Sequence, residues 1–135
     1  MSEFKQIIPI EPVTLANAMI TPDGTVIQSF SQHDCKRHVD ENGLTYMVDG
    51  GLGWYQRAID DGQGKRIIID SDDDHSVIRE WFSWGSYGKK GDQLKRWIKL
   101  KDMEDDHINS ILDGNFVIET YRFVFENETE WRKVL

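Results

Sequence analysis

A glycine- and lysine-rich loop, residues 86–93, lies between two groups of aromatic and basic residues. Glycines let backbone N–H groups approach a phosphate, and lysines add local positive charge. Neighbouring aromatic and guanidinium groups can stack on a base. We expect an anionic small molecule to bind here, through Trp84, Tyr87, Lys89, Lys90 and Arg96. The alternative is a solvated connection between two elements, whose aromatic residues belong to the core.

A second cluster has the residue types that bind zinc or iron, namely His33, Asp34 and His38, with Asp49 as a further carboxylate. Such a site would belong to a small metal-dependent phosphodiesterase or nuclease. In the simpler interpretation, Asp34 caps a turn and His38 lies on an exposed hairpin face. We favour the simpler interpretation because spacing alone does not show convergence on one ion. We therefore expect no bound metal and no cofactor.

Two acidic runs, Asp72–Asp74 and Glu104–Asp106, precede apolar residues at helical spacing. Carboxylates are favoured at the first turn of a helix, where the helix dipole is positive, and their recurrence at two helix starts fits that role. We expect these acids, together with His75 and His107, to lie on the solvated surface.

Composition excludes several classes of protein. The 135 residues include 24 acidic and 16 basic residues, a net charge of −8 that argues against general nucleic-acid binding. The single cysteine excludes an internal disulfide, and no apolar run reaches the ~18 residues of a membrane span. No signal-peptide pattern is recognised at the start. We expect one cytoplasmic domain, residues 1–135, without a membrane partner.

Turn signals predict two antiparallel hairpins in the N-terminal half. Pro22–Gly24 lies between residues that favour strands, and Asn42-Gly43 does so as well. The first twelve residues are expected to be an extended lead-in, which packs through its isoleucines or pairs as an edge strand. The apolar run Arg66–Ile69 predicts a central strand.

Helical spacing of apolar residues predicts helices at about 73–84, 103–112 and 117–132. Ser71 is expected to cap the start of the first of these helices, and Gly85 is expected to end it. Residues 116–125 remain open to either helix or strand. Hairpins followed by helices predict an α+β fold. Trp131 is expected to dock on the body or to pair with a second subunit, which suggests a homo-oligomer.

Three motifs resemble a group of small uncharacterised proteins encoded by tailed bacteriophages and some large viruses. They are MITPDGT at 19–25, YMVDGG at 46–51 and WGSYGKKGDQ at 84–93, and the resemblance spans residues 18–132. It implies no known activity and no catalytic residue. It implies a setting, the cytosol of an infected bacterium, in which small accessory proteins act against host components.

Two functions from different classes follow. The first is a phage-type, non-enzymatic binding module, for example one that sequesters a nucleotide immune signal as counter-defence. Its partner would be a small phosphorylated ligand or a host protein, since an acidic surface can also engage a basic partner. The second is the metal-dependent enzyme that uses His33, Asp34 and His38. We favour the binding module because no convincing nucleophile is present.

Overall fold

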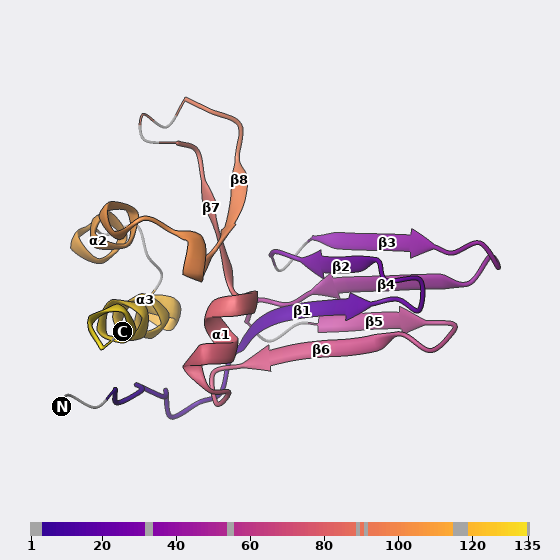
Figure 1. The fold of residues 1–135 in the computed structure, drawn as a ribbon, viewed down its shortest axis with the longest axis horizontal. Coiled ribbons are helices and arrows are strands. Elements are labelled where there is room, and N and C mark those ends of the chain that lie inside the picture. The colour runs from indigo at the N-terminus through magenta and orange to yellow at the C-terminus, as the bar shows by residue number, and fades with distance from the viewer. Residues whose placement is uncertain are drawn as a thin grey trace. The chain divides into compact units, whose positions relative to one another are not determined.

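In the residues that it describes, the computed structural model has eight strands and three α-helices, which form an α+β fold as expected (Figure 1). The structure describes residues 4–31, 34–53, 56–88, 90, 92–114 and 119–134. The chain divides into two units: residues 12–71 form one, and residues 1–11 with 72–135 form the other.

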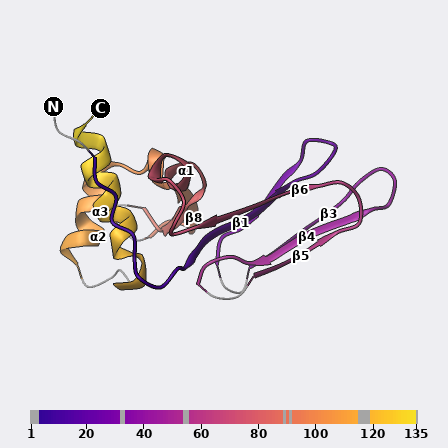
Figure 2. The ribbon, with the colours of Figure 1, turned by 90° about the horizontal axis from the view of Figure 1, so that it is seen from below.

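The unit formed by residues 12–71 contains two three-stranded antiparallel sheets (Figure 2). The first has the order β2-β1-β6, and its strands are β1 (Thr14–Ile20), β2 (Val26–Ser29) and β6 (Lys65–Asp70). The second has the order β3-β4-β5, and its strands are β3 (Cys35–Val39), β4 (Thr45–Gly50) and β5 (Gln56–Asp60). Both sheets contribute to one apolar core, made by Met19, Ile27, Tyr46 and Val48.

Both predicted hairpins are confirmed. Ile20 pairs with Val26 across the first turn, and Val39 pairs with Thr45 across the second. Gly24 and Gly43 have φ of 88° and 78°, a left-handed conformation that glycine adopts without the steric cost of a Cβ.

The expected central position of residues 66–69 is wrong, because β6 is an edge strand and β1 is the central strand of its sheet. The side chain of Ile68 is 37% exposed, whereas β1 is buried along almost its whole length. A short apolar run marks a strand, but it does not reveal how many neighbours that strand has.

The described residues of the other unit form three α-helices and one hairpin. In chain order its elements are α1 (His75–Trp81), β7 (Ser83–Ser86), β8 (Arg96–Lys99), the 3₁₀ turn η1 (Leu100–Asp102), α2 (Asp105–Asp113) and α3 (Glu119–Lys133). The predicted second and third helices correspond to α2 and α3. The open choice for residues 116–125 is decided for 119–125, which are helical, whereas 116–118 lie outside the described residues.

The first predicted helix is too long at both ends. Asp74, not Ser71, is its N-cap, because the Asp74 carboxylate accepts a hydrogen bond from the N–H of Ser76. The helix ends at Trp81, and the carbonyl of Phe82 accepts a hydrogen bond from the N–H of Leu100. Gly85 therefore lies in β7 and does not terminate a helix.

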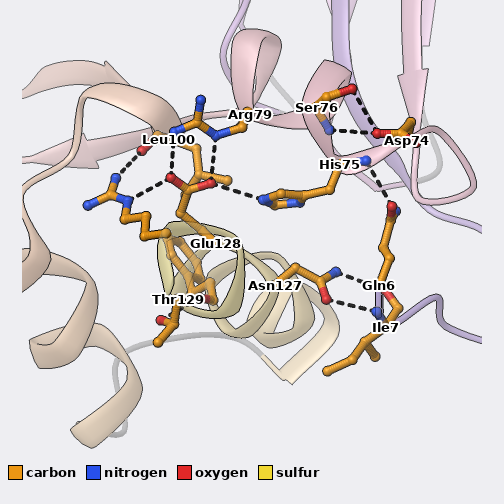
Figure 3. A network of polar contacts seen from close by, with 12 residues as sticks. Gln6, Ile7, Asp74, His75, Ser76, Arg79, Leu100, Asn127, Glu128 and Thr129 are labelled. Carbon is orange, nitrogen blue, oxygen red and sulfur yellow. Dashed lines mark hydrogen bonds and ion pairs between the residues drawn. The ribbon is translucent and has the colours of Figure 1, made fainter. Parts of the chain in front are cut away.

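The lead-in is held by its backbone and by Gln6 rather than by its isoleucines. Ile8 and Ile10 are 51% and 101% exposed, so the expected packing through isoleucines is wrong. The side chain of Asn127 in α3 accepts a hydrogen bond from the N–H of Ile7 (2.8 Å) and donates one to its carbonyl (2.9 Å; Figure 3). Gln6 bonds the N–H of His75 at 2.8 Å.

Candidate functional site

An open cleft of about 1110 Å³ lies between the β7–β8 hairpin and the segment from η1 to α2. Ser86 pairs with Arg96 in the hairpin, so their side chains share the face that lines the cleft. The N–H of Gln93 bonds the carbonyl of Tyr87 at 2.9 Å and closes the loop at the hairpin tip. The hairpin wall includes Ser86, Gly88, Lys90, Arg96 and Ile98, and the opposite wall includes Asp102, Glu104, Asp106, His107 and Ser110.

The two walls carry opposite charges. Lys90 and Arg96 contribute cations from the hairpin, and neither is in an ion pair with any residue that the structure describes. The opposite wall contributes the carboxylates of Asp102, Glu104 and Asp106. This arrangement suits a ligand with an anionic group at one end and hydrogen-bond donors at the other, because charge-assisted hydrogen bonds are the stronger kind.

His107 adds a hydrogen-bonding group to the acidic wall. Burial lowers the pKa of His107 from its usual value of 6.5, and the nearby Glu104 carboxylate only partly opposes that effect. The imidazole is therefore neutral at pH 7, so that it can donate one hydrogen bond and accept another.

The structure separates the predicted ligand residues. Lys90 and Arg96 line the same cleft, whereas Lys89 lies outside the described residues. Trp84 is half-buried, and its ring lies 5.2 Å from that of Phe125 in an aromatic cluster with Phe82 and Tyr121. Tyr87 lies under the ammonium of Lys95, 5.9 Å from it, and does not line the cleft.

The alternative metal site at His33, Asp34 and His38 is not assembled by those of its residues that are described. The Asp34 carboxylate accepts hydrogen bonds from Lys36 Nζ at 2.7 and 2.8 Å, and His38 Nε2 lies 2.8 Å from Asp23 Oδ2. Four positions along an extended chain separate Asp34 and His38 by ~13 Å. That separation is too large for both to bind one ion directly. His33 lies outside the described residues, and the remainder contain no group of three potential ligands.

A buried ionic cluster in the helical unit was not expected from the sequence. His75 was expected at the surface, but this is wrong: its side chain is completely buried and its Nε2 lies 2.9 Å from Glu128 Oε1 (Figure 3). Glu128 also accepts hydrogen bonds from Arg79 at 2.9 Å and from Arg132 at 2.7 Å. The sequence does contain a sign of this cluster. Glu128 lies on the apolar face of its helix, and Arg132, which can pair with it, follows four residues later.

This cluster connects α3 with the acidic wall of the cleft. Arg132 bonds Glu128 and also donates hydrogen bonds to the carbonyl of Leu100 at 3.0 Å and to the carboxylate of Asp105 at 2.7 Å. Burial raises the pKa of Glu128, but the hydrogen bonds from His75, Arg79 and Arg132 outweigh this and lower it to about 2. The carboxylate is therefore ionised at neutral pH and holds η1 and the start of α2 through Arg132.

Comparison with family models, with curated proteins and with solved structures found no match. No helix in the described ranges is both long enough and apolar enough to cross a membrane. Function is therefore inferred from the residues of the cleft themselves.

Proposed function

We propose that the chain is a non-enzymatic binding module whose cleft takes a small phosphorylated ligand of the nucleotide type. The observation that carries this proposal is the presence of Lys90 and Arg96 opposite three carboxylates in one open cleft. Phosphate oxygens would bind the two cations, and the amino groups of a base would face the carboxylates. The cleft volume of about 1110 Å³ slightly exceeds the ~300–1000 Å³ range of common ligand sites, so a nucleotide has enough room.

Binding of this kind requires no nucleophile. It requires donors for a phosphate and acceptors for a base, and the cleft walls supply both. Repulsion at long range by the net charge of −8 means that affinity must come from short contacts with Lys90 and Arg96. The neutral His107 adds a hydrogen bond that does not depend on charge.

The phage resemblance supplies the setting of the proposal. A homo-oligomeric accessory protein that sequesters a nucleotide immune signal would act as counter-defence in the bacterial cytosol. A host protein is the alternative partner. The two differ in what the purified chain retains, which is a small molecule in the first case and a polypeptide in the second.

The test is to incubate the purified chain with a bacterial nucleotide extract, wash it, release the bound material and identify it by mass spectrometry. We expect enrichment of a phosphorylated compound. The matched control is the double variant Lys90→Ala with Arg96→Ala, which should retain little of that compound. Equal retention by both chains, or retention of none, would contradict the proposal.

A further inference from the structure

The face of the β7–β8 hairpin opposite the cleft carries alternating rings and ammonium groups. Nζ of Lys95 lies 4.3 Å from the ring centroid of Trp97 and 5.9 Å from that of Tyr87. Nζ of Lys99 lies 5.4 Å from the ring of Trp81. These five residues form what we call the lysine–aromatic row. Trp97 and Lys99 come from β8, Tyr87 and Lys95 from the loop between β7 and β8, and Trp81 from the end of α1.

Strand register places this row away from the cleft. Trp97 pairs with Gly85, one position along from the pair of Ser86 and Arg96, and successive side chains on a strand point to opposite faces. A side chain at Gly85 would collide with the side chain of Lys95. Because Gly85 has no side chain, the side chain of Lys95 can lie over β7 at this position and reach the rings of Trp97 and Tyr87.

Both lysines of the row belong to a basic segment of an acidic chain. Residues 89–101 contain six of the 16 lysines and arginines and one acid, Asp92. Lys95 and Lys99 are exposed, and neither forms an ion pair within the described part of the chain. The acids that follow in sequence, Asp102 and Glu104, line the cleft on the other side of the hairpin. Lys95 and Lys99 thus lie on the face away from these carboxylates, whereas Lys90 and Arg96 line the cleft with them.

We propose that the lysine–aromatic row binds single-stranded nucleic acid. Lys95 and Lys99, each two positions from Trp97, would contact phosphates, and Tyr87, with 54% of its surface exposed, would stack on a base. Alternate residues on a strand are spaced by ~6.7 Å, which is comparable to the step between nucleotides in an extended strand. Stacking is sequence-tolerant, and it distinguishes single strands from duplexes, whose bases are already stacked.

An anionic membrane is the competing occupant, because lysines and aromatic residues also gather at membrane surfaces. Membrane binding requires apolar side chains that enter the acyl region. The hairpin offers one such exposed residue, Leu94, which is 91% exposed. The ammonium of Lys95 lies over the ring of Trp97 in β8, and that of Lys99 lies over the ring of Trp81 at the end of α1, which favours a stacked, extended polyanion over an inserted tip.

The experiment is fluorescence anisotropy with a dye-labelled oligothymidylate of ~12 nucleotides, measured over a range of salt concentrations. We expect binding at low salt. Lys95→Gln with Lys99→Gln should weaken binding at least tenfold and reduce the slope of log K against log salt by ~1.4. The matched control is Lys5→Gln with Lys65→Gln, which removes the same charge from two exposed positions elsewhere and should leave the affinity within about twofold.

Tyr87 provides a readout that does not depend on charge. Tyr87→Ala should weaken binding roughly tenfold, whereas Tyr87→Phe should retain it. Absence of binding at low salt, equal losses in the two lysine double variants, or binding to vesicles that contain anionic lipid but not to the oligonucleotide would each overturn the proposal.

Discussion

Nε2 of His75 lies 2.9 Å from Oε1 of Glu128, and the side chains of both residues are completely buried. The two come from α1 and α3, 53 positions apart in the chain. Arg79 and Arg132 bond the same carboxylate, so the buried negative charge is compensated on several sides. This relationship determines how the helical unit responds to substitution and to acid.

Glu128→Gln should destabilise the helical unit. The amide cannot match the carboxylate as an acceptor, and it removes the negative charge that faces Arg79 and Arg132, which leaves Arg132 with the exposed carboxylate of Asp105. Breaking a buried ion pair from one side costs about 3–5 kcal/mol. Urea unfolding measures the loss. Glu126→Gln, in the same helix but 41% exposed, is the matched control and should cost under about 1 kcal/mol. Equal costs would contradict this account of the cluster.

Acid should remove the same stabilisation. The folded chain lowers the pKa of Glu128 from 4.5 to about 2, so the stabilisation is complete above pH ~5 and is lost as pH falls towards 2. The free energy of unfolding at neutral pH should exceed that near pH 2 by on the order of 3 kcal/mol from this group alone. Glu128→Gln should flatten the pH profile between pH 5 and 2, whereas parallel profiles for the two chains would contradict the assignment.

Asn127→Ala should release the lead-in. Its amide bonds both backbone groups of Ile7, and the methyl group of alanine can replace neither bond. Hydrogen exchange should show faster exchange of the Ile7 amide, which the wild type protects. Asn109→Ala, an exposed change in α2, should leave that amide protected. Unchanged protection in Asn127→Ala would show that other contacts hold the lead-in.

Asn17→Ala should destabilise the unit formed by residues 12–71. The buried Asn17 amide donates to the carbonyls of Asp49, Gly50 and Arg57 at 3.2–3.3 Å, and so connects the two sheets. Unsatisfied buried carbonyls cost about 1–3 kcal/mol, which urea unfolding can measure. The exposed change Gln63→Ala is the control and should be nearly neutral. A neutral Asn17→Ala would remove this amide from the account of how the sheets are joined.

Purified protein should contain far less than one transition metal per chain. The side chain of Asp34 bonds Lys36, and that of His38 bonds Asp23. Strand geometry also keeps Asp34 and His38 apart. Elemental analysis checks this. About one zinc, manganese or iron per chain would instead favour the metal-dependent phosphodiesterase or nuclease.

Local turn chemistry could be predicted from the sequence because it depends on neighbouring residues. Gly24 and Gly43 adopt the positive φ that their turns require. The boundaries of α1 were not predictable in this way. Trp81, Phe82 and Trp84 fit helical spacing, but pairing of Trp84 with Ile98 takes the last of them into a strand. A tertiary partner 14 positions away outweighed the local pattern.

The site shows the same division between local and distant information. Residue types marked the loop between β7 and β8 as a place for anions, and the structure brings Lys90 and Arg96 to one cleft. The sequence predicts the acids of the opposite wall only as residues at the start of a helix. Nothing in the local sequence indicates that Asp102 and Glu104 face the hairpin. His75 was misplaced for the same reason, since its partner Glu128 is distant in sequence.

Isothermal titration calorimetry with the compound recovered from the nucleotide extract tests the cleft most directly. Each charged hydrogen bond that is removed costs about 1.5–3 kcal/mol, so Lys90→Ala with Arg96→Ala should lower affinity at least tenfold. The midpoint of urea unfolding should stay unchanged, because both side chains are exposed. Lys5→Ala with Lys65→Ala controls for net charge and should bind as the wild type does. Unchanged affinity in the cleft variant would contradict the assignment of this cleft as the ligand site.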